Sequence, residues 1–122
     1  MNPEEHRRID WVTSIALVIF HILAIYGLSM ATTAAVITFA VLYAVSVLGI
    51  TVGFHRYYTH KAFKASKFLQ RLLAVMGTIA MQGSLFKWVA HHRMHHAASD
   101  TDKDPHNAAK GFWHSHLMWM LG

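Results

Sequence analysis

The sequence predicts an all-α membrane protein in which a two-helix transmembrane hairpin is followed by a cytosolic helical region rich in histidine. Of its 122 residues, 54% are hydrophobic and 14% are charged, and the mean hydropathy is +0.29. This is too apolar for an ordinary soluble domain. No Lys, Arg, Asp or Glu lies between Trp11 and Phe54. Six of the eleven histidines fall into two short clusters, residues 55–60 and 91–96, each after an apolar stretch.

The hairpin occupies residues 11–54 and follows a short N-terminal segment, residues 1–10, that is expected in the cytosol. A membrane-spanning helix needs about 20 apolar residues, and two spans fit, roughly Trp11–Met30 and Ala34–Phe54. Small and polar residues around Thr32 mark the reversal between them, so we expect a tight hairpin. A secretory signal peptide is the weaker interpretation because a second apolar run follows at once.

The basic residues predict the orientation of the hairpin. They flank it on both sides, at positions Arg7, Arg8, Arg56, Lys61, Lys64, Lys67, Arg71, Lys87, Arg93, Lys103 and Lys110. By the positive-inside rule, both ends of the hairpin and the histidine region face the cytoplasm. The net charge of +5 is explained by this topology or by anionic headgroups, so no nucleic acid partner is expected.

The histidine region, residues 55–122, is expected to be helical and interfacial. Residues 68–81 read as a helix whose apolar run is only ten residues long, which favours a re-entrant, interfacial or core helix over a third span. Residues 85–96 read as a helix that carries the second cluster. A polar loop follows over residues 97–111, and residues 112–122 turn apolar and aromatic, as if a further membrane segment began there.

The second cluster has the spacing of a metal site. Residues three and four apart share a helical face, so His92, His95 and His96 can present ring nitrogens to one side. His91 and His95 are also four apart, so the spacing permits either His91 or His92 as the first ligand. Without cysteine, any metal must be held by nitrogen and oxygen, which suits iron and zinc about equally. The simpler alternative is a solvated histidine-rich face.

The first cluster is less regular. His55 and His60 are five residues apart, or about 140° around an ideal α-helix, so one continuous α-helix would not aim both at one ion. They would serve two adjacent metals, or one of them would lie past a helix end. The alternative is an aromatic belt at the membrane surface with Tyr57 and Tyr58.

Several motifs in the same order resemble the membrane fatty acid desaturases of the acyl-CoA or delta-9 type. They are Gly53-Phe54-His55-Arg56 with His60, Gln82-Gly83, Trp88, His92-Arg93-Met94-His95-His96, Asp104-Pro105-His106-Asn107, and Gly111-Phe112-Trp113 with Ser115-His116. The resemblance implies half of a four-span bundle around a non-haem centre of two iron ions. Carried over residue by residue, it makes His55, His60, His92, His95 and His96 iron ligands, and it leaves His91 outside them.

The resemblance also implies an activity, the introduction of a cis double bond into a fatty acyl chain with O₂ and two electrons. No fused electron carrier is visible, so a separate donor of the ferredoxin or cytochrome b5 type is expected. One alternative to a desaturase is a histidine-box lipid hydroxylase or oxygenase, which uses the same iron chemistry. The other alternative is not an enzyme but a non-catalytic membrane metal-binding protein.

The sequence departs from the family pattern in two ways. Family members carry a third box, HxxHH, and no histidine follows His116 here. The chain is therefore expected to be an N-terminal portion that is inactive alone. Animal acyl-CoA members have Asn and Arg where this chain has Gly83 and Ala90, which looks like the bacterial pattern and predicts a multi-pass protein of a bacterial inner membrane. Acyl-CoA, acyl carrier protein and acyl-lipid remain open as substrate carriers.

Overall fold

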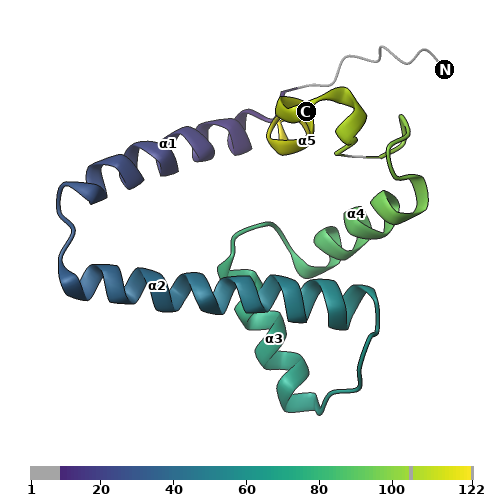
Figure 1. The fold of residues 1–122 in the computed structure, drawn as a ribbon, viewed down its shortest axis with the longest axis horizontal. Coiled ribbons are helices and arrows are strands. Elements are labelled where there is room, and N and C mark those ends of the chain that lie inside the picture. The colour runs from purple at the N-terminus through teal and green to yellow at the C-terminus, as the bar shows by residue number, and fades with distance from the viewer. Residues whose placement is uncertain (1–8, 105, 122) are drawn as a thin grey trace.

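A computed structural model describes residues 9–104 and 106–121, and every regular element within them is a helix (Figure 1). The all-α prediction is therefore confirmed for this part of the chain. The helices are α1 (Trp11–Leu28), α2 (Thr33–Leu48), the π-helix η1 (Gly49–Thr59), α3 (Lys67–Ile79), α4 (Leu85–Ala98), the 3₁₀ turn η2 (Ala108–Lys110), α5 (Phe112–His116) and the 3₁₀ turn η3 (Met118–Met120). Most of the N-terminal segment predicted to be cytosolic lies outside the described residues.

Each of the four long α-helices begins at a polar side chain. Asp10, Thr32, Ser66 and Ser84 stand directly before them, and each side-chain oxygen accepts a hydrogen bond from the backbone N–H three residues later, at 3.1 to 3.3 Å. Such caps satisfy a backbone donor that the helix itself leaves unpaired. The starts of the helices are thus fixed by local sequence.

Among the described residues, two helices are long and apolar enough to cross a membrane, Trp11–Leu28 and the continuous stretch Thr33–Thr59. The two helices reverse direction at a short turn, as the predicted hairpin requires, but they are not packed tightly against each other. From their connecting turn α1 and α2 diverge (Figure 1), and neither helix buries any residue. The turn joins only their ends, and large apolar side chains remain exposed along both helices. In this chain α2 instead packs against α3.

The best-packed part of the molecule lies where α3 runs back along η1 and the end of α2. A Cβ atom on Gly49 would fall on the backbone of Met76 and Gly77, and one on Gly77 would fall on the ring of Phe54. The two glycines therefore let the helices approach closely. Phe54, which is 0% exposed, fills the space between them. The predicted helix over 68–81 is confirmed, and it is packed on one face and exposed on the other.

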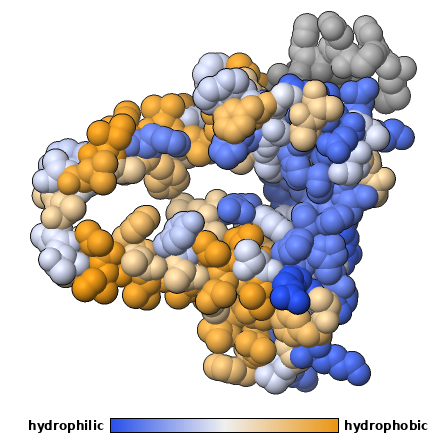
Figure 2. All heavy atoms as spheres, in the orientation of Figure 1, coloured by the Kyte–Doolittle hydropathy of each residue, from blue (hydrophilic) through white to orange (hydrophobic). Residues whose placement is uncertain are grey.

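The C-terminal residues fold back over the start of α1. Residues 112–121, where the sequence suggests the onset of a further membrane segment, form two short helices, α5 of five residues and η3 of three. The backbone N–H of Asp10 donates to the carbonyl of Leu121 at 2.7 Å. Figure 2 shows hydrophobic residues along α1, α2 and α3, and hydrophilic residues gathered at the end of the molecule away from the α1–α2 turn. The histidine clusters lie at this hydrophilic end.

Candidate metal centre

The π-helix brings the two histidines of the first cluster to one side. A π-helix joins residue i+5 to residue i, and the backbone N–H of His60 donates to the carbonyl of His55 at 3.1 Å in this way. The two imidazole rings lie 4.6 Å apart between centroids. The expectation of a 140° separation is therefore wrong, because it assumed an α-helix. His60 directly follows the last residue of η1, as one of the two alternatives had it.

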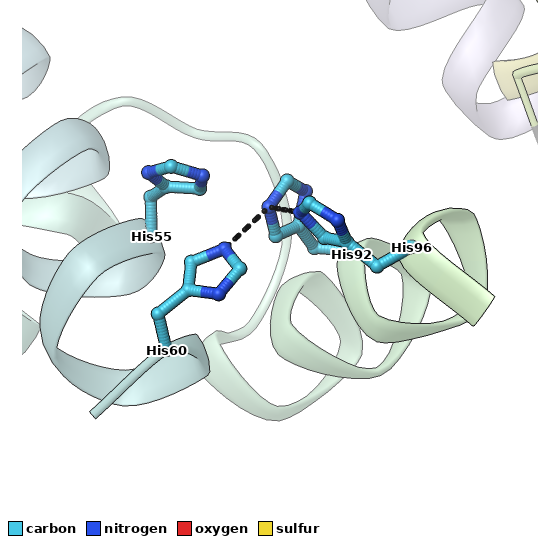
Figure 3. Close-up of side chains that lie close together, drawn as sticks. All are labelled: His55, His60, His92 and His96. Carbon is cyan, nitrogen blue, oxygen red and sulfur yellow. Dashed lines mark hydrogen bonds between the residues drawn. The ribbon is translucent and has the colours of Figure 1, made fainter. Parts of the chain in front are cut away.

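Two histidines of α4 complete a cluster of four with His55 and His60 (Figure 3). One nitrogen from each of the four rings lies within 4.8 Å of the other three. The Nε2 atom of His92 is 3.3 Å from Nε2 of His60 and 3.0 Å from Nε2 of His96. Two imidazole nitrogens bonded to one metal ion at about 2.1 Å, with bond angles between 90° and 109°, would be separated by roughly 3.0 to 3.4 Å. The separations of His92 from His60 and from His96 therefore fit one ion, and His55 lies near enough to be a further candidate ligand.

The electrostatics of the cluster keep its central imidazole neutral. Removal from solvent lowers the pKa of His92 to about 4, and repulsion from His55, His96 and His60 adds to this effect. Only a neutral imidazole has a lone pair to offer to a metal. Near neutral pH, His92 is thus in the form that coordinates.

Neighbouring side chains hold the two halves of the cluster together. The indole of Trp88 stacks on the ring of His92, with centroids 4.9 Å apart, and meets the edge of Phe54 at 5.8 Å. The guanidinium of Arg93 donates to the carbonyls of Tyr58 and Thr59, at 3.3 and 3.5 Å. A cation is favourable there because the C-terminal carbonyls of a helix carry partial negative charge. Helix α4 is in this way tied to the end of η1.

The structure places His92, and not His91, in the four-histidine cluster. The ring of His91 lies beside Trp119, with centroids 6.0 Å apart. Burial lowers the pKa of His91, as does the nearby charge of Lys87. The rotation of α4 thus brings the ring of His92, and not that of His91, to the other three histidines, and the choice of His92 as the first ligand stays a prediction.

His95 lies next to the cluster but is engaged elsewhere. Its ring centroid is 6.1 Å from that of His92 and 5.6 Å from that of His96, and it belongs to a second group of potential ligands with Asp104 and His106. Its Nδ1 atom is 2.9 Å from Oδ2 of Asp104. Desolvation raises the pKa of the Asp104 carboxyl, but hydrogen bonds from the backbone of Asp100, from His95 and from the backbone of His106 outweigh it and lower the pKa overall.

Asp104 is the residue that sequence reasoning misses. It belongs to one of the quoted motifs but receives no role there. It is one of three aspartates that alternate over residues 100–104, and only Asp104 is buried. The available signal is that these are the first carboxylates after the second histidine cluster. Spacing alone does not say which of the three turns inward.

Comparison with known proteins agrees with this geometry. The family model described as "Fatty acid desaturase" matches residues 30–122. The chain belongs to the fatty acid desaturase family. It is 44% identical to an sn-1 stearoyl-lipid 9-desaturase of Anabaena variabilis over 93% of the chain, and 43% identical to an acyl-CoA Delta-9 desaturase of Acheta domesticus over 98%. It is 42% identical to a probable acyl-CoA desaturase of Schizosaccharomyces pombe over 94% of the chain.

The chain spans only part of these relatives, namely 43%, 35% and 24% of their respective lengths. The resemblance recognised from the histidine boxes is confirmed at the level of the family. Both histidine boxes lie inside the matched residues, so the four-histidine cluster is part of the region that the family shares.

Proposed function

We propose that this chain forms the iron-binding N-terminal part of a fatty acid desaturase, which introduces a cis double bond into a fatty acyl chain. The observation that carries the proposal is the convergence of four imidazoles from two boxes, with His60 and His92 brought together across 32 positions of sequence. Membership of the desaturase family supports the same reaction.

Iron is the metal we propose, with two ions in the complete centre. His55, His60, His92 and His96 would hold the first ion, because Nε2 of His92 has the separation that one ion requires from Nε2 of His60 and of His96, and a nitrogen of His55 lies within 4.8 Å of the other three. His95 would serve the second ion, because its ring lies beside the cluster of four without belonging to it. The further ligands of the second ion would come from the part of the relatives' length that this chain does not span.

The chemistry needs a metal because no side-chain acid or base breaks an unactivated methylene C–H bond. Iron bound at this centre would supply the oxidising power, with O₂ and two electrons consumed, two hydrogens removed and water released. The residues of this chain provide the surroundings. Trp88 and Phe54 cover one side of His92 and His55 with aromatic surface that excludes water. His60 and His96 are exposed, which leaves the cluster open on the side where a substrate and the rest of the enzyme would approach.

The substrate we propose is a fatty acyl group. The carrier is acyl-CoA, acyl carrier protein or a membrane lipid, and the names of the relatives include both acyl-CoA and stearoyl-lipid enzymes. The electron donor would be a separate protein of the ferredoxin or cytochrome b5 type. Exposed cations near the site, Arg56 and Lys61 among them, would favour a donor with an acidic surface.

We further propose that α1 and α2 with the start of η1, as far as Phe54, cross the membrane and that the histidine boxes lie on the cytoplasmic side of a bacterial inner membrane. The charge distribution and the hydropathy of the two helices support this. The polar end of the molecule, where the histidines lie, would then face the cytoplasm (Figure 2).

Fatty acid analysis of an expressing host tests the proposal. We expect no new product from residues 1–122 alone. We expect a new unsaturated fatty acid when the chain is complemented in trans by the C-terminal part of the Anabaena variabilis relative. The same complemented assembly with His92→Ala is the control and should form none. A hydroxylated product would replace the proposal with the oxygenase alternative, and unsaturated product from the chain alone would contradict its dependence on a second part.

A further inference from the structure

Asp104 is a carboxylate with almost no access to solvent. The residue is 1% exposed, and its side chain is 0% exposed. It stands in the loop between α4 and η2. A buried carboxylate is costly unless hydrogen bonds and charges compensate it, so its contacts indicate what it is for.

Both oxygens of Asp104 already accept hydrogen bonds. Oδ2 accepts from Nδ1 of His95 at 2.9 Å and from the backbone N–H of Asp100 at 3.0 Å. Oδ1 accepts from the backbone N–H of His106 at 3.1 Å. The Nδ1 atom of His106 is 3.8 Å from the same oxygen, which is too far for a hydrogen bond. Within residues 9–104 and 106–121, His95 is therefore the one side chain that Asp104 binds directly.

A metal ion held by His95, Asp104 and His106 themselves is the competing interpretation, since their ligand atoms lie within 4.8 Å of one another. One feature argues against it. The carboxylate oxygens already accept from three donors, and one of these donors is Nδ1 of His95 itself.

The bond to Asp104 has a definite consequence for His95. A carboxylate only accepts, so Nδ1 of His95 must carry a proton, and in the neutral imidazole Nε2 then carries the lone pair. Without this bond, the ring could rotate, and in the neutral imidazole the proton could lie on either Nδ1 or Nε2. Histidine ligands of metals commonly donate their second ring N–H to a carboxylate, which fixes the ring and makes the other nitrogen a better donor.

We infer that Asp104 is a positioning residue that fixes the orientation and tautomer of His95 so that Nε2 is presented for metal coordination. The inference rests on the proposed function, because it takes His95 to be an iron ligand. Asp104 itself is not a ligand.

A second buried residue of the same loop provides a matched control. Asn107 is 3% exposed. Its Nδ2 donates to the carbonyl of Thr101, and its Oδ1 accepts from the backbone N–H of Ala109, both at 2.8 Å. Asn107 therefore stabilises the loop through side-chain hydrogen bonds to Thr101 and Ala109, neither of which is a histidine. A variant at this position loosens the loop and leaves the bond between Asp104 and His95 in place.

The first arm of the test is nitrogen-15 NMR of the histidine rings in the metal-free chain, with the His95 signals assigned by a His95→Gln variant. We expect the Nδ1–H tautomer for His95 in the wild type and in Asn107→Ala. We expect a loss of this preference in Asp104→Ala. Asp104→Asn, which keeps the side-chain volume, guards against a loop that fails to fold. An Nε2–H tautomer of His95 in the wild type would overturn the inference.

The second arm is iron retention against a graded chelator, measured on the chain complemented by the C-terminal part of the Anabaena variabilis relative. Loss of an outer hydrogen bond of this kind typically weakens metal binding by roughly 10- to 100-fold, and we expect this for one of the two irons in Asp104→Asn. Equal loss in Asn107→Ala, or none in Asp104→Asn, would overturn the inference. The expected tautomer without any iron binding by the wild type would instead overturn the proposed function and with it the metal role of His95.

Discussion

At the scale of single residues, the site depends on which side chains α4 turns toward η1. His91 and His92 are adjacent in sequence, yet one lies beside Trp119 and the other lies at the centre of the four-histidine cluster. Spacing predicts that α4 presents histidines to one face, but it does not predict the rotation of the helix, which depends on packing against η1. For the same reason the place of His95 beside Asp104 could not be read from the sequence.

Replacement of these two neighbours provides the first prediction. In the complemented assembly, His92→Ala should remove the central ligand of the cluster, so iron content and product formation should both be lost. His91→Ala should retain iron, because its ring contributes no nitrogen to the cluster. Iron analysis and a product assay of both variants decide this. An active His92 variant beside an inactive His91 variant would reverse the assignment.

Arg93 provides the second prediction. Its guanidinium is bonded to two carbonyls at the end of η1, and a cation at a helix C-terminus contributes about 1 kcal/mol. Arg93→Gln should therefore weaken iron binding by about fivefold, since the two halves of the cluster are held less firmly. Arg71→Gln, on the exposed side of α3, is the control. The role given to Arg93 is wrong if chelator titration finds the same affinity for both variants.

At the scale of elements, the helix starts could be predicted, whereas the π-helix could not. The caps Ser66 and Ser84 are local signals, and α3 and α4 begin directly after them. The i+5 bonding of η1 has no such signal, because Gly49–Thr59 is also compatible with an α-helix. Its effect is decisive for the site, since it turns His55 and His60 to one side. Rare π-helices are often found at functional sites for this kind of reason.

The packing of α3 on η1 provides the third prediction. A methyl group at Gly77 would collide with the ring of Phe54, and overpacking of this kind typically lowers the free energy of unfolding by roughly 1–3 kcal/mol. Gly77→Ala should therefore lower the thermal stability of the chain in detergent and reduce its iron content, because Phe54 adjoins His55 in η1. Gly27→Ala is the same substitution in open space and should leave both unchanged. Equal melting temperatures for the two variants would contradict the packing argument.

At the scale of the whole molecule, composition predicts the separation of an apolar and a polar end, and the structure has it (Figure 2). The contact between the two long helices is where prediction failed. Apolar composition makes a helix suitable for lipid, but it does not make two such helices attract each other in lipid. The close contact of α2 is instead with α3, through glycines at positions 49 and 77.

Topology provides the fourth prediction. The chain has no cysteine, so single cysteines can be introduced without background. Asn2→Cys and Asp102→Cys should react with a membrane-impermeant reagent only from the cytoplasmic side, because the basic residues flank both ends of the hairpin. Met30→Cys, in the turn between α1 and α2, should react only from the opposite side. Opposite sidedness of positions 2 and 102 would contradict the two-span topology.

The most direct test of the metal centre is X-ray absorption at the iron edge on the purified chain loaded with one equivalent of Fe²⁺. The four-histidine cluster predicts one tightly bound iron whose spectrum shows the multiple-scattering pattern of several imidazoles, with metal–nitrogen distances of about 2.1 Å. The double variant His60→Ala and His96→Ala should lose this signature while the chain stays folded. An iron shell made of oxygen alone in the wild type, or a spectrum that the double variant leaves unchanged, would contradict the assignment of the cluster as an iron site.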